Sequence, residues 1–217
     1  MGVGHVAIAF AGKHFAPKVS LGWLIFATLF VDVLWAATVG FGIEHVRIEK
    51  GFLPASPFDL YDYPWTHSLV GSLGWSVGFA ALAWLVLRDV RGALVLGLAV
   101  LSHWVLDLIA HKPDLPVLPS GPYLGLGLWY SLWGTILVEA LMVAGAAWVY
   151  LKETRASDRL GHWGLIGLLG FLLVMHLAVY LGPPPTVAMI PWSGLTLLLP
   201  MVFAHVVDRH RTAVAAA

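Results

Sequence analysis

The sequence predicts an all-α fold, a polytopic membrane protein with six transmembrane helices in a single domain over residues 1–217. Hydrophobic residues make up 59% of the chain and charged residues only 11%, and the mean hydropathy is +0.85. Soluble domains usually carry about 25% charged residues, so this composition indicates a chain largely surrounded by lipid. The formal net charge is zero, which gives no indication of nucleic-acid binding.

Six apolar stretches are each long enough to cross a bilayer, for which a helix needs about 20 mainly apolar residues. The expected spans are 20–43, 66–87, 92–111, 128–151, 162–181 and 190–207. Basic residues cluster in the connections on one side, which the positive-inside rule makes cytoplasmic. They are Lys13, Lys18, Arg88, Arg91, Lys152, Arg155, Arg159, Arg209 and Arg211. This pattern predicts that both termini are cytoplasmic (N-in/C-in).

The first 16 residues are apolar but too short to span a membrane. Taken alone, they favour a helix lying on the membrane surface. The alternative is a half-helix that enters the bundle, with His5 toward mid-membrane and Lys13 at the cytoplasmic face. No basic residue precedes the first apolar stretch, so we expect no cleaved signal peptide.

The connections and helix ends are expected to be polar and accessible. The two long outer connections, 44–65 and 112–127, would cover a cavity that opens to the outside, and the second is rich in Pro and Gly and should be irregular. At the cytoplasmic end, we expect His205, Asp208 and His210 to be solvated.

The third span carries a polar stripe. His103, Asp107 and His111 follow one another at intervals of four residues, so they share one helix face over roughly 12 Å. Ionisable side chains are costly in hydrocarbon, which makes the stripe a candidate functional site. His111 falls at the outer rim, where we expect a gate or a solvated side chain.

Ionisable residues also fall at middle and outer depths of other spans. At about 1.5 Å rise per residue, Asp32 and Glu139 lie near the middle, and His67 and His176 lie further out. Each of these residues also has a purely structural alternative. A lone His, for example, can donate a hydrogen bond to a backbone carbonyl, and for His176 this alternative and a role in the site are both left open. The group is harder to explain structurally, because each member needs a partner and the available partners are mainly one another.

The chemistry of the group indicates a divalent cation. Carboxylates with histidines suit a hard or borderline ion that offsets buried negative charge. Zinc takes such ligands, and thiolate ligation is excluded because the sequence has no cysteine. Water activated by the metal could attack an ester or phosphoester. The same residues could instead relay protons or pass cations, and spacing does not distinguish these functions.

Four elements together resemble the YdjM-like family of bacterial inner-membrane proteins, described as membrane-bound metal-dependent hydrolases. They are Gly4-His5, Asp32, Thr66-His67-Ser68-Leu69, and Ser102-His103 through Asp107 into the Pro-rich stretch 113–119. The resemblance covers residues 1–120, a metal-site half, whereas the additional helices of residues 121–211 contribute little to it. It implies the bacterial inner (cytoplasmic) membrane and a half-helix at the N-terminus. The metal ligands that it implies are His5, Asp32, His67, His103 and Asp107.

The leading hypothesis is a membrane-embedded hydrolase with one or two divalent ions, zinc foremost, acting through an outward-facing cavity on a lipid ester or phosphoester. The family has a denser acidic patch around the position of Asp32, and His111 and Glu139 are candidate substitutes. Glu139 or His111 would act as general base. The alternatives are a metal-cation or proton transporter using the same residues, and a heme- or pigment-binding subunit of a membrane complex. The sequence does not indicate an oligomeric state.

Overall fold

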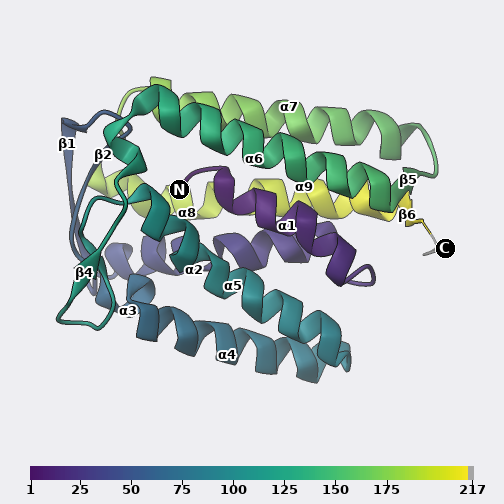
Figure 1. Cartoon of the computed structure of the whole chain (residues 1–217), viewed down its shortest axis with the longest axis horizontal. Helices are drawn as coiled ribbons and strands as arrows, with labels where there is room; N and C mark the ends of the chain where they lie inside the picture. Colours follow the sequence, from purple (N-terminus) through teal and green to yellow (C-terminus); the bar gives the residue numbers. More distant parts are fainter. Residues whose placement is uncertain (215–217) are drawn as a thin grey trace.

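The computed structural model describes residues 1–214, which form an elongated bundle of helices along one axis (Figure 1). In this part of the chain, six helical segments are long and apolar enough to cross a membrane. They are α2 (Leu21–Gly40), α4 (Leu69–Leu87), α5 (Val90–Ala110), α6 (Leu132–Glu153), α7 (Arg159–Leu181) and the composite segment Val187–Arg209. The expectation of six helices with this length and polarity is confirmed.

The long helices begin where the sequence provides a capping side chain. The Ser or Asp before each helix accepts a hydrogen bond from a backbone N–H of the first turn, which satisfies one of the donors that a helix start leaves free. The capping residues of α2, α4, α5, α6 and α7 are Ser20, Ser68, Asp89, Ser131 and Asp158. At α7, the hydrogen bond from Gly161 and the contact with His210 hold the pKa of Asp158 below its usual value.

The last segment is interrupted, unlike the continuous helix expected over 190–207. It consists of a 3₁₀ turn η2 (Val187–Met189) and two helices, α8 (Ile190–Thr196) and α9 (Leu198–Arg209). Pro200 explains the break, because proline has no N–H to donate to the carbonyl four residues earlier, which is that of Thr196, and its ring crowds that carbonyl.

The N-terminal helix α1 (Gly4–Phe15) lies inside the bundle, packed against α2, α5 and α6 (Figure 1). Val6, Ala9 and Phe10 are buried, and so is Met1. The surface helix favoured by the first residues alone is therefore wrong, and the half-helix is correct. We call the end of the bundle that carries the connections between α4 and α5 and between α6 and α7 the basic end, because most of the basic residues lie there. Met1 lies within the bundle, and only the far end of α1, which contains Lys13, reaches the basic end. Which end faces the cytoplasm stays a prediction.

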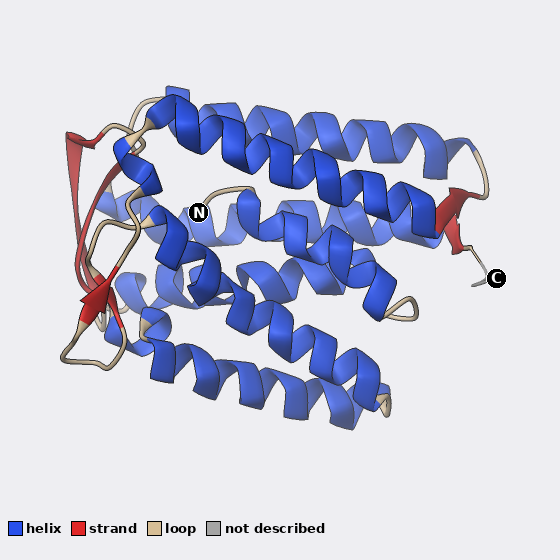
Figure 2. Ribbon diagram, viewed as in Figure 1, coloured by secondary structure: helices blue, strands red, loops and turns tan. Residues whose placement is uncertain are grey.

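Short strands lie at the two ends of the bundle, so the all-α prediction holds only for the bundle itself (Figure 2). The first outer connection is a β-hairpin of β1 (His45–Leu53) and β2 (Ser56–Asp62), and the second contains the short pair β3 (Leu115–Pro116) and β4 (Tyr123–Leu124). At the opposite end, β5 (Thr154–Ala156) pairs with β6 (Arg211–Ala213). The hairpin places Val46 and Leu60 in an apolar cluster that covers the near ends of the helices.

A buried polar group at the basic end corrects one expectation. Asp208 is not solvated: its carboxylate accepts hydrogen bonds from the Lys13 ammonium (2.6 Å), the Tyr150 hydroxyl (2.7 Å) and the backbone N–H of Leu21 (3.0 Å). Its exposed fraction is 7%. Asp208 thus joins α1, α2, α6 and α9 at one point.

Candidate metal centre

The polar stripe of the third span is present on α5 and is fully buried. The Nε2 atom of His103 lies 3.1 Å from Oδ2 of Asp107, and the Nε2 atom of His111 lies 3.9 Å from the same oxygen. His111 is the residue that ends α5, and it is only 2% exposed. The expectation of a solvated rim histidine is therefore wrong, because the loop after α5 and the residue Trp129 pack over it.

Three other elements bring donor atoms to this stripe. From α1, the Nε2 atom of His5 lies 3.2 Å from Oδ1 of Asp107. From α2, Oδ1 of Asp32 lies 3.5 Å from Nε2 of His103 and 3.6 Å from Nε2 of His67. His67 ends the short helix α3 (Pro64–His67), separated from α4 by the extended Ser68, so the span expected over 66–87 is broken at that residue.

These donors form two overlapping groups, and within each group the donor atoms lie within 4.8 Å of one another. Among the described residues, one group is His5, His103 and Asp107, and the other is Asp32, His67 and His103. The five residues are those expected as metal ligands. In a tetrahedral site with ligands about 2.1 Å from zinc, donor atoms are about 3.4 Å apart. The spacings of 3.1 and 3.2 Å in the first group and of 3.5 and 3.6 Å in the second are close to this value, so each group has donor separations typical of a metal site.

In His67 and His103, the Nδ1 atom makes a hydrogen bond outside the cluster, which leaves the Nε2 atom directed toward the cluster. Nδ1 of His103 donates to the backbone carbonyl of Thr28 (2.9 Å), and Nδ1 of His67 lies 2.7 Å from the Thr66 hydroxyl. A histidine whose Nδ1–H is donated in this way keeps the Nε2 lone pair free for a metal.

Two of the inward nitrogens have no hydrogen-bond partner within residues 1–214. They are Nε2 of His5 and Nε2 of His103, both on side chains at most 1% exposed. Nearby carboxylate oxygens are close enough but do not meet them in hydrogen-bond geometry. The two imidazoles also stack in parallel, with centroids 3.8 Å apart. A buried polar atom without a hydrogen-bond partner lowers the stability of a protein by about 1–3 kcal/mol. A metal ion bound by these two nitrogens would supply the partner that each of them lacks. The buried amino group of Met1 donates a hydrogen bond to Oδ1 of Asp107 and forms an ion pair with it, so this carboxylate also has a cationic partner within the chain.

An outer layer of hydrogen bonds supports His67, and sequence reasoning did not find it. Glu44 is completely buried between β1 and the end of α2, and its carboxylate accepts from the Thr66 hydroxyl (2.8 Å) and backbone N–H (2.9 Å). Since the Thr66 hydroxyl donates to Glu44, it accepts from His67. Such carboxylate-backed histidines are usual around metal sites. In the sequence, the signal that could have indicated this partner is the position of Glu44, an acidic residue directly after the apolar span 20–43.

His111 is held by a similar arrangement at the hairpin end. Its Nδ1 lies 3.0 Å from Asp114 Oδ1 and 3.3 Å from the Tyr63 hydroxyl, which donates to the Asp114 carbonyl. Burial lowers the pKa of His111 and raises the pKa of Tyr63 well above its ordinary value. Leu115, Trp129 and their neighbours fill the space above, so the cavity expected to open outward here is closed by side chains.

Glu139 and His176 belong to neither donor group. The Glu139 carboxylate accepts from the backbone N–H groups of Gly2 and Gly4, both at 3.0 Å, and from the Tyr180 hydroxyl at 2.6 Å. His176 donates to the carbonyl of Ile136 (3.0 Å), as its structural alternative required. The general-base role expected for Glu139 stays a prediction, although its contacts indicate a different use.

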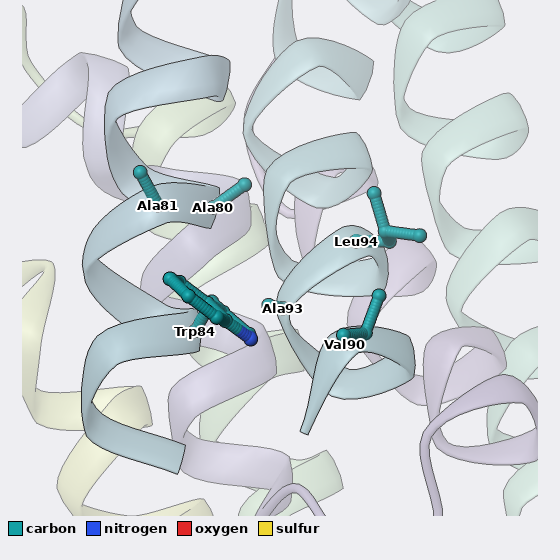
Figure 3. Close-up of a pocket in the computed structure, with 6 residues that line it drawn as sticks. All are labelled: Ala80, Ala81, Trp84, Val90, Ala93 and Leu94. Atoms are coloured by element: carbon teal, nitrogen blue, oxygen red, sulfur yellow. The ribbon is translucent and has the colours of Figure 1, made fainter. Parts of the chain in front are cut away.

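The pocket shown in Figure 3 is unrelated to this cluster. It lies between α4 and α5 near the turn that joins them, has a volume of about 330 Å³ and is lined only by apolar side chains. The lining residues are Ala80, Ala81, Trp84, Val90, Ala93 and Leu94. It offers no metal-binding atom.

Replacing Thr66 with Val should weaken zinc binding about 10- to 100-fold, because the isosteric side chain can no longer orient His67. Competition with a chromophoric chelator measures this affinity. Thr135→Val is the matched control, since among residues 1–214 the buried Thr135 hydroxyl bonds only to the carbonyls of Leu128 and Ser131. Equal affinities in the two variants would show that Thr66 does not support a ligand.

Comparison with protein-family models, with curated proteins and with solved structures produced no match. Membership of the YdjM-like family therefore stays a prediction.

Proposed function

We propose that the cluster binds one divalent ion, zinc foremost, and that the chain is a membrane-embedded hydrolase of a lipid ester or phosphoester. The observation that carries the proposal is the convergence of donor atoms from α1, α2, α3 and α5, two of them buried without a hydrogen-bond partner among the described residues. The candidate ligands are the members of the two groups, His5, Asp32, His67, His103 and Asp107. A divalent ion in such a site supplies a Lewis acid and lowers the pKa of water.

The overlap of the two donor groups favours a single ion. His103 belongs to both groups, but its Nδ1 is committed to Thr28, so only Nε2 can bind a metal. One nitrogen lone pair does not serve two ions. We therefore propose one ion rather than two.

The position of His111 suits a proton acceptor beside the site. Its Nε2 faces Asp107 at 3.9 Å, while its Nδ1 is held by Asp114, so the ring is oriented but its inner nitrogen is not tightly bound. We assign His111 the role of general base toward an attacking water, in preference to Glu139, whose oxygens already accept three hydrogen bonds.

Access to the site supports a substrate from the bilayer. The side chain of Asp32 is 26% exposed, whereas those of His5, His67, His103 and Asp107 are at most 7% exposed. Asp32 lies on α2, one of the helices long enough to span a membrane. A lipid ester would thus approach the site laterally, beside α2.

The alternatives receive less support from the same geometry. Between the cluster and the basic end, α1, α2 and α5 contribute to an apolar core that includes Phe10, Leu24 and Val100. This core offers a cation no polar path from the cluster to the basic end. The stacked rings of His5 and His103 leave no space between them for a heme or pigment.

The test combines metal analysis with a hydrolysis assay on detergent-purified protein. We expect about one zinc per chain, cleavage of a member of a panel of phospholipids, diacylglycerols and polyprenyl phosphates, and loss of cleavage on chelation. His103→Ala should lose both properties, whereas His162→Ala, an exposed histidine on α7, should retain them. Absence of metal from the wild type would refute the centre. Bound metal without cleavage of any panel member would refute the hydrolase, and liposome cation flux abolished by Asp107→Asn would favour the transporter.

A further inference from the structure

The start of α1 has no capping side chain of its own. Its N-cap position is Val3, which makes no side-chain cap hydrogen bond, and no acidic residue lies in the first turn. The long helices α2, α4, α5, α6 and α7 each begin with a capping Ser or Asp. The first N–H groups of a helix need acceptors, above all when the helix starts inside an apolar bundle.

Glu139 of α6 supplies these acceptors from across the bundle. Its Oε1 accepts the N–H of Gly2 and its Oε2 accepts the N–H of Gly4, each at 3.0 Å. The carboxylate is completely buried and is held in place by the Tyr180 hydroxyl of α7 at 2.6 Å. A carboxylate at this position also interacts favourably with the positive end of the helix dipole.

The two glycines make this contact possible. A Cβ on Gly2 would lie 3.2 Å from both Glu139 Oε2 and the Tyr180 hydroxyl, and a Cβ on Gly4 would lie 3.2 Å from Glu139 Cγ. Both distances are tighter than ordinary van der Waals contact. Gly-Val-Gly at positions 2–4 therefore lets the backbone approach the carboxylate closely, which explains why glycine directly precedes His5.

The contact lies one residue from a proposed metal ligand. His5 follows Gly4 on the first turn of α1, is 0% exposed, and has its Nε2 3.2 Å from Asp107. A shift of α1 along its axis would move this nitrogen away from the other donors, because the rest of α1 is held mainly by apolar packing until Lys13.

We propose that Glu139 is a positioning residue that sets the place of His5 in the metal centre by capping α1 from α6. The inference rests on the proposed metal centre but assigns Glu139 a role other than proton transfer. It also makes the additional helices part of the site, since α6 and α7 hold the acceptor that orders a ligand of the metal-site half.

A double-mutant cycle tests this coupling through zinc affinity, measured by chelator competition. Glu139→Ala should weaken binding about 10- to 100-fold, as removal of outer-layer partners does. Glu139→Gln, whose amide oxygen can still accept an N–H, should recover part of the loss. In a His5→Ala background, Glu139→Ala should change the affinity less than about twofold, because its effect passes through His5. Additive losses in the double variant, or an unchanged Glu139→Ala, would overturn the proposal.

A second measurement does not depend on metal. The sequence contains no cysteine, so Ala7→Cys places a single thiol on α1 at a position that is 4% exposed. We expect slow thiol labelling that is accelerated at least about tenfold by Glu139→Ala and little by Glu49→Ala, the control variant that removes an exposed acid of the β-hairpin. If the wild type binds no zinc, the proposed centre fails, and this labelling alone decides whether Glu139 anchors α1. Equal labelling in both variants would refute the anchor.

Discussion

Asp107→Asn is expected to lower the affinity for zinc by more than about a hundredfold while keeping the helical bundle folded, because the Asn side-chain oxygen can still accept the hydrogen bond of the buried Met1 amino group. Asp107 is the shared neighbour of four imidazoles from three elements, with His5 and His103 at 3.2 and 3.1 Å and His67 and His111 at 3.8 and 3.9 Å. Loss of an outer-layer partner typically costs 10–100-fold in metal affinity, so loss of a direct ligand should cost more. Asparagine keeps the size of the side chain but removes the charge and most of the donor strength.

Elemental analysis after dialysis, followed by chelator competition, measures this effect. His162→Ala provides a matched loss of an ionisable side chain outside the cluster and should bind zinc like the wild type. Circular dichroism checks that the Asn variant retains its helices. Zinc affinity within about twofold of the wild type would exclude Asp107 as a ligand, since such a ratio corresponds to only about 0.4 kcal/mol.

Asp208→Ala is expected to produce the largest loss of stability, about 3–5 kcal/mol, because it leaves the buried Lys13 ammonium without its counter-charge. The variant also removes the acceptor for Tyr150 and for the backbone N–H of Leu21. For a chain of this length each kcal/mol shifts the melting temperature by about 2–4 °C, so a decrease of roughly 6–20 °C should appear in thermal unfolding in detergent.

Two comparison variants define this effect. Glu49→Ala, an exposed acid of the β-hairpin, should change the stability by less than about 0.5 kcal/mol. The double variant Lys13→Met/Asp208→Leu should recover much of the loss, since apolar replacement of both partners leaves no unpaired buried charge. Folded Asp208→Ala should still bind zinc, because an apolar core separates the two polar groups. A melting temperature equal to that of the wild type would show that the buried pair adds no stability.

Local sequence patterns were sufficient to predict the spans and most of the candidate ligands. Apolar length predicts the six helical segments, and the interval of four residues predicts that His103 and Asp107 share a helix face. The cost of ionisable groups in hydrocarbon explains why Asp32 and His67 come to the same place, since few other partners exist at that depth. The family resemblance added His5, which spacing alone did not connect to the others.

Contacts between residues far apart in the chain decided what local patterns could not. Asp208 and Glu139 each look like an isolated acid in the sequence, yet one pairs with Lys13 and the other caps the start of α1, 195 and 135 residues away. The hairpin and the break at Leu197 also escaped prediction, since one depends on packing over the helix ends and the other on one proline. Sequence by itself determined which segments are helical and which polar groups must find partners. Only the tertiary structure decided which partner each group found. A buried charged or hydrogen-bonding group must have a partner, but the sequence does not show which distant residue will provide it.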